Sequence, residues 1–209
     1  MTAQFDDTFR YRDRDYSIAG ISEGELFDIS VFGLKPSMAS TACWRGYLAV
    51  FALVESHLVL DTLHVNLLRP GDGRRRFERQ EGPIINGVAP SPQKKSPPKE
   101  DLDELDFFNN HYDGLSYQLK YSGGILLADG FIQSLYVHMG FHPAWKYTTV
   151  IELVFDAGIL KGEFDRSDRM AEVREMVTKS PKAGSSSEMP TRKEIEQFVE
   201  RAFDRSYRR

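Results

Sequence analysis

The sequence predicts an α+β protein whose core is a mainly antiparallel β-sheet of about eight to ten strands, followed by two helices at the C-terminus. The sheet is predicted because the apolar segments before residue 167 are short, rich in β-branched and aromatic residues, and separated by turn residues. The helices are predicted because apolar residues recur at helical spacing only after residue 167. Alternating strand and helix patterns are missing, which excludes a doubly wound nucleotide-binding sheet.

Two segments one hundred residues apart resemble each other, and each is predicted to form a hairpin. Residues 44–54 and 145–154 both contain a tryptophan, a tyrosine and an apolar, β-branched run. A polar turn follows each segment, at residues 55–57 and 156–158, and a second apolar run comes next. This similarity favours two related β-units that can derive from an internal duplication. The recurring residues are Tyr47, Val50, Leu53, Val54 and Leu60, which match Tyr147, Val150, Leu153, Val154 and Leu160.

A meander is predicted between these hairpins. Residues 115–121 alternate apolar and polar side chains, as in a strand with one buried face. Gly123 and Gly124 then turn the chain into a second strand over residues 125–128. Asp129 and Gly130 are the residue types of a tight hairpin turn, so a third strand is expected over residues 131–137.

The chain is predicted to divide into a β-rich globular domain over residues 1–180, a flexible linker over residues 181–190, and an amphipathic helix over residues 191–209. Within the domain, residues 69–106 are predicted to form a long mobile loop insertion, because prolines interrupt them and basic and acidic residues segregate along them. Residues 82–88 are the part of this insertion expected to contact the core. The last helix carries an apolar stripe that requires a surface to cover it, either its own domain, a dimer partner or another protein. That stripe consists of Ile195, Phe198, Val199, Ala202 and Phe203.

Composition excludes several functional classes. The net charge of −4 over 209 residues does not favour general nucleic-acid binding. No run of eighteen apolar residues is present, so we predict no membrane-spanning segment. The single cysteine, Cys43, excludes an internal disulfide and suits a reducing compartment, so we predict a soluble cytoplasmic protein. No nucleotide-binding motif is present, and no cofactor is predicted.

The densest cluster of reactive groups lies at residues 136–145. Helical spacing of His138 and His142 would suit a metal, but Gly140 and Pro143 argue against a helix, and we predict no metal site. Arg45 lies at the start of an apolar strand, so it must be exposed at the strand end or paired with a carboxylate.

Three functions are compatible with these patterns. The first is a non-catalytic interaction protein, an adaptor or inhibitor that binds a partner protein or a second copy of this chain. The second is a small-ligand-binding β-domain with an aromatic pocket and Arg45 as its polar anchor. The third is a hydrolase with His138 or His142 as base and Cys43, Ser40 or a metal-bound water as nucleophile. The candidate partner-binding or ligand-binding residues are Tyr136, His138, Phe141, His142, Trp145, Arg45, Tyr117 and Tyr121. No catalytic residue is assigned.

Overall fold

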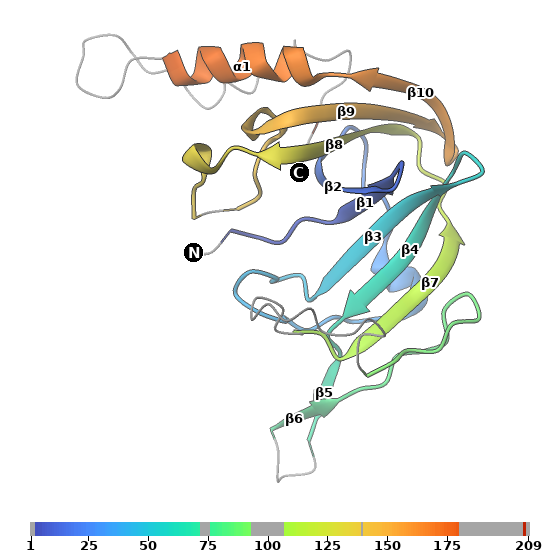
Figure 1. The fold of residues 1–209 in the computed structure, drawn as a ribbon. Coiled ribbons are helices and arrows are strands. Elements are labelled where there is room, and N and C mark those ends of the chain that lie inside the picture. Colours follow the sequence, from blue (N-terminus) through green and yellow to red (C-terminus); the bar gives the residue numbers. More distant parts are fainter. Residues whose placement is uncertain (1–2, 72–75, 93–106, 139, 180–206, 208–209) are drawn as a thin grey trace.

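A computed structural model describes residues 3–71, 76–92, 107–138, 140–179 and 207 (Figure 1). These residues form a mostly β protein with one α-helix, which confirms the predicted β core. The predicted linker 181–190 lies outside the described residues, as does the helix 191–209 apart from Tyr207.

The strands are β1 (Thr8–Tyr11), β2 (Arg14–Ile21), β3 (Tyr47–Val54), β4 (His57–Val65), β5 (Leu68–Pro70), β6 (Phe77–Arg79), β7 (Asn110–Gln118), β8 (Gly123–Phe131), β9 (Tyr147–Asp156) and β10 (Ile159–Asp165). The helix is α1 (Ser167–Lys179), and three short 3-10 helices are η1 (Ile29–Phe32), η2 (Gln133–Leu135) and η3 (Ala144–Lys146).

Eight strands form one mixed sheet in the order β10-β9-β8-β2-β1-β3-β4-β7. All neighbours are antiparallel except β1 and β3, which are parallel. The sheet curves strongly, with β8, β9 and β10 facing β3, β4 and β7 across the interior (Figure 1). Ile159 of β10 pairs with His57 of β4, so the curved sheet closes on itself at this point. β5 and β6 form a separate two-stranded sheet.

Both predicted hairpins form, and they share this one sheet. β3–β4 and β9–β10 meet at their turns, where Leu58 N–H donates to Gly158 O at 2.8 Å and Leu160 N–H donates to Ser56 O at 2.9 Å. Their surroundings differ: β3 pairs with the parallel strand β1, whereas β9 pairs with the antiparallel strand β8. Tyr47 packs inside the sheet and Tyr147 packs under the helix. Internal duplication therefore remains a hypothesis.

Two apolar clusters stabilise the fold. The larger fills the interior of the curved sheet and includes the fully buried Phe9, Leu60 and Tyr112. The smaller lies between the outer face of the sheet and α1, where Met170 and Val173 contact it from successive helical turns. The helix begins at Ser167, and the Ser167 hydroxyl accepts a hydrogen bond from Val150 N–H at 3.1 Å.

The predicted turn at Asp129 and Gly130 is wrong. β8 continues through both residues to Phe131, which pairs with Tyr147. Gly130 has φ of 68° within the strand, so its positive φ produces a local irregularity there instead of a hairpin. The chain then forms a loop over residues 132–146, containing η2 and η3, in place of the third predicted strand.

The predicted insertion over residues 69–106 is described only in part. Its described residues include β6 and a bridge between Ile85 and Val88, and Ile85 is buried in the main core. Tyr112 on β7 donates a hydrogen bond to Pro83 O at 2.9 Å. The expected contact of residues 82–88 with the core is therefore present.

Candidate functional site

A cavity of about 220 Å³ lies between the inner faces of β2 and β3 and the loops that contain Glu25 and Phe141. Its wall is mostly apolar, and the polar groups reach it from the strand ends and a loop. The apolar lining comes from Ile18, Ile21, Leu26, Phe27, Phe51 and Phe141, and the polar lining from Asp7, Glu25, Arg45 and Tyr47. This combination is typical of a small-molecule site.

The ion pair of Arg45 and Asp7 forms the polar floor of the cavity. β1 and β3 run parallel with Thr8 beside Val50, so Asp7, just before β1, lies next to the start of β3. Both carboxylate oxygens of Asp7 accept hydrogen bonds from Arg45 at 2.6 Å, and Asp7 Oδ1 also accepts from Ala49 N–H at 2.8 Å. Arg45 Nε donates to Tyr47 O at 2.9 Å. Each side chain of the pair is thus also held by a hydrogen bond to the backbone of β3.

Burial opposes the charged form of Arg45, but the Asp7 carboxylate more than offsets that effect and raises the pKa of the guanidinium. Arg45 is therefore charged at any physiological pH. Its guanidinium also lies over the Tyr47 ring, 4.8 Å from the ring centre. The cation-binding face of that ring is thus already occupied by a side chain of the protein.

Tyr47 supplies the hydroxyl of the cavity. Its ring packs edge-on against Phe27, with ring centres 5.9 Å apart. Burial raises the pKa of the Tyr47 phenol, so the hydroxyl is protonated at neutral pH. Within the described part of the chain, the Tyr47 hydroxyl has no hydrogen-bond partner. It can therefore donate to a ligand or accept from one.

A wider groove of about 550 Å³ adjoins the cavity and shares Glu25, Leu26 and Phe27 with it. Tyr117 and Tyr121 line the groove. The Tyr121 hydroxyl donates to Gly124 O at 3.0 Å and accepts from Glu23 N–H at 3.3 Å, so it holds the wall in place. The groove therefore extends the cavity along the surface beyond the three residues that they share.

The histidine loop, residues 132–146, forms a cluster of its own. The His138 Nδ1 lies 3.3 Å from the Tyr136 hydroxyl, and the buried His142 lies with its Nδ1 3.3 Å from Lys146 Nζ. A lysine amine beside His142 opposes a metal cation at the same place. Within the described ranges, no group of three or more His, Cys, Asp or Glu side chains is arranged to hold a metal.

Cys43 and Ser40 do not pair with a histidine in the part of the chain that the structure describes. The Cys43 thiol donates to Tyr47 O at 3.3 Å, and the Ser40 hydroxyl accepts from Ala42 N–H at 3.2 Å. Burial raises the pKa of the Cys43 thiol, which disfavours the reactive thiolate. The nucleophile and base that the hydrolase hypothesis required are therefore not brought together there.

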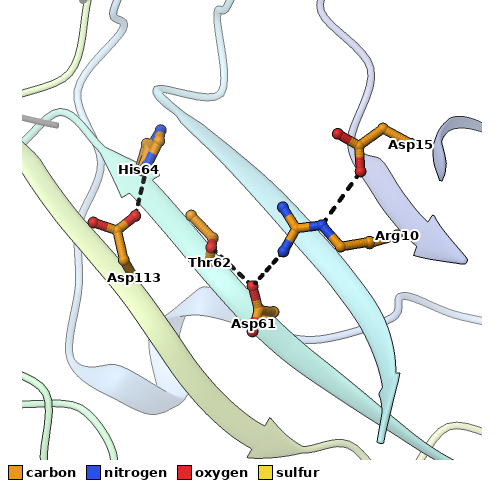
Figure 2. A network of polar contacts seen from close by, with 6 residues as sticks. All are labelled: Arg10, Asp15, Asp61, Thr62, His64 and Asp113. Atoms are coloured by element: carbon orange, nitrogen blue, oxygen red, sulfur yellow. Dashed lines mark hydrogen bonds and ion pairs between the residues drawn. The ribbon is translucent and has the colours of Figure 1, made fainter. Parts of the chain in front are cut away.

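A polar network lies on β1, β2, β4 and β7 (Figure 2). Arg10 bridges Asp61 at 3.3 Å and Asp15 at 3.4 Å, but its side chain is 52% exposed. His64 Nε2 lies 3.4 Å from Asp113 Oδ1 on the neighbouring strand. The exposed Arg10 pairs contribute little to stability. The His64 and Asp113 side chains are less exposed, at 18% and 32%.

The structure divides the predicted partner-binding or ligand-binding residues among three places. Arg45 and Phe141 line the cavity, Tyr117 and Tyr121 line the groove, and Tyr136, His138, His142 and Trp145 belong to the histidine loop. The predicted partner helix lies outside the described residues. Sequence reasoning missed Asp7, Glu25 and Phe27 as site residues, because they are ordinary residue types in two segments that carry no motif. The sequence singles out Tyr47 only as part of a repeated hairpin, and its strand, apolar at every position, has no alternation that would identify its inner face.

Comparison with protein-family models, with curated proteins and with solved structures finds no match for this chain. None of the helices in the described ranges is long and apolar enough to cross a membrane.

Proposed function

We propose that this protein binds a small, largely apolar molecule with one hydrogen-bonding head group in the cavity. The observation that carries this proposal is an apolar cavity with a buried Arg45–Asp7 pair and the Tyr47 hydroxyl in its wall. This is the second of the three functions compatible with the sequence, and Arg45 is the polar anchor predicted for it.

The size of the cavity suits a ligand of about one aromatic ring. An apolar cavity of roughly 150 Å³ is enough to bind benzene. At about 220 Å³ this cavity has room for a ring with one or two substituents. Larger ligands would extend past Phe27 into the adjoining groove, which shares that side chain.

The charges at the cavity select against ionic ligands. Arg45 and Asp7 neutralise each other, so neither sign of charge is favoured at the floor. The exposed Glu25 carboxylate at the shared rim repels anions. A neutral head group that hydrogen-bonds to the Tyr47 hydroxyl fits this arrangement best.

The test compares two probes that differ by one hydroxyl, p-cresol and toluene, by isothermal calorimetry. Both should bind, and p-cresol should bind roughly 2- to 10-fold more tightly, as expected for one additional neutral hydrogen bond. Tyr47→Phe should remove this advantage while toluene affinity stays unchanged.

Ile18→Trp should abolish binding of both probes, because the indole would occupy the cavity beside Phe51. Ile159→Trp is the matched control, since Ile159 is 38% exposed on β10 and lies outside the cavity lining. Circular dichroism confirms that both variants fold. Equal binding of the probes by the Ile18→Trp variant and the control would refute the proposal.

Partner-protein binding is a second candidate, favoured by exposed apolar residues near the N-terminus. Trp44 is 57% exposed and Phe5 is 40% exposed. Their segments are joined, because Phe5 N–H donates to Ala42 O at 2.9 Å and Trp44 N–H donates to Gln4 Oε1 at 3.2 Å. Trp44→Ala should then weaken a partner complex without lowering the thermal midpoint. A homodimer through residues 191–209 and a cytoplasmic location stay predictions from the sequence.

A further inference from the structure

A buried lysine lies in the histidine loop, away from the cavity lining. Lys146 ends η3 and only 6% of its surface is exposed. Its backbone is fixed at both ends, because its N–H donates to Pro143 O at 3.0 Å and its carbonyl accepts from Ile132 N–H at 2.9 Å. A lysine is seldom buried to this extent without a partner carboxylate.

No carboxylate pairs with Lys146 in the described ranges of the chain. Its Nζ makes one hydrogen bond, with His142 Nδ1 at 3.3 Å, and lies 5.5 Å from the centre of the Trp145 ring. The Arg174 guanidinium donates to the backbone carbonyls on either side of Lys146, Trp145 O at 2.9 Å and Tyr147 O at 2.6 Å. Burial lowers the pKa of the Lys146 ammonium, so a larger fraction is the free amine at neutral pH than for an exposed lysine.

The groups around this amine are aromatic and uncharged or weakly basic. The His142 ring lies 4.7 Å from the Phe131 ring and 5.3 Å from the Tyr136 ring, measured between centres. Such a site disfavours a charged adduct and favours a neutral one.

We propose that Lys146 is a site for reversible covalent capture of small aldehydes as an imine, with His142 as the proton acceptor and donor. This assignment is independent of ligand binding in the cavity. The substrate class is neutral aldehydes with a short apolar chain, because Lys146 Nζ lies beside the Trp145 and His142 rings and pairs with no carboxylate among the described residues.

The step balances as follows. The Lys146 ammonium gives a proton to His142 Nδ1, and the amine lone pair attacks the aldehyde carbon, forming the C–N bond as the carbonyl electron pair moves to oxygen. His142 returns its proton to that oxygen and takes one from the nitrogen. It then protonates the hydroxyl, which leaves as water while the C=N bond forms, and the imine nitrogen releases its last proton to solvent. The lysine ammonium and the aldehyde thus give an imine, water and one proton.

The test treats the full chain with propanal and sodium cyanoborohydride at pH 7 and maps the N-propylated lysines by peptide mass spectrometry at early times. Lys146 should be labelled faster than each of the exposed Lys35, Lys120 and Lys161, because burial leaves a larger fraction of it as the free amine and His142 can accept its proton. Labelling of Lys146 no faster than of these three lysines would overturn the proposal.

The role of His142 has its own matched pair of variants. His142→Gln should slow the labelling of Lys146 toward the rate of the exposed lysines, and His138→Gln should leave it unchanged, because His138 is exposed and contacts Tyr136 instead. Equal Lys146 rates in the two variants would show that His142 does not transfer the protons, and would overturn the assignment.

Discussion

Replacing either partner of the Asp7–Arg45 pair should destabilise the fold far more than replacing a surface ion pair. The side chains are only 17% and 27% exposed, and two hydrogen bonds of 2.6 Å join them. Breaking a fully buried pair costs about 3–5 kcal/mol, because the remaining charge stays buried without its partner. Partial exposure reduces this cost, so Asp7→Asn and Arg45→Met should each cost about 2–3 kcal/mol. Asparagine keeps an oxygen for Ala49 N–H, so the loss in Asp7→Asn reports the ion pair.

The double variant measures the coupling directly. Because neither charge is then left unpaired, its cost should fall short of the sum of the single costs by about 2 kcal/mol. Urea unfolding followed by circular dichroism gives these free energies, provided that the m-value is unchanged. Arg10→Met is the control, since Arg10 is 52% exposed in its pair with Asp61, and it should cost less than about 0.5 kcal/mol. A coupling energy below about 0.5 kcal/mol would refute the conclusion that the pair is a buried structural anchor.

Three further predictions concern positions outside the cavity. Burial raises the pKa of the fully buried Tyr112 to about 12. The protonated phenol therefore contributes up to about 3 kcal/mol to the free energy of unfolding below pH 10, and this contribution is lost between pH 10 and about 12. Alkaline unfolding should start at higher pH in Tyr112→Phe, and an unchanged alkaline unfolding curve would contradict this. The Tyr207 hydroxyl donates to the buried Glu152 carboxylate. Tyr207→Phe should therefore lower the free energy of unfolding by about 1.5–3 kcal/mol in urea titrations. A loss below about 0.5 kcal/mol would show that this contact is dispensable. A methyl group at Gly158 would lie 1.9 Å from a backbone oxygen, whereas one at Gly24 would meet nothing within 4 Å. Gly158→Ala should therefore lower the free energy of unfolding by at least about 2 kcal/mol more than Gly24→Ala, and equal losses would contradict the close approach.

Local sequence patterns predicted where strands form, but they did not predict which distant strands pair with each other. The hairpin of β3 and β4 follows from two apolar runs around a polar turn. The parallel pairing of β1 with β3 has no local pattern, because it joins segments about forty residues apart through side-chain packing. The error at Gly130 has the same origin: its turn-forming sequence is overridden by pairing of β8 with β9 on both sides of it.

The site was predictable only as a list of residue types. Arg45 was predicted to be either exposed at the strand end or paired with a carboxylate, and the structure shows the pair. Its partner Asp7 could not be chosen among many acidic residues without the β1–β3 register. Trp145 was expected in a pocket wall, and the structure places it instead on η3, where its carbonyl is bound by Arg174. The cavity requires five separate segments to converge, which hydrophobic periodicity does not encode.

The most direct test of the central claim is a measurement of intermolecular nuclear Overhauser effects between p-cresol and the methyl groups of the isotopically labelled protein. Ligand binding in the cavity predicts contacts from the cresol ring to the methyl groups of Ile18, Ile21 and Leu26, which line it. It predicts none to Leu63, which is buried in the core and is not part of the cavity wall. Absence of contacts to Ile18 at saturating p-cresol, or contacts confined to surface methyl groups, would contradict the account.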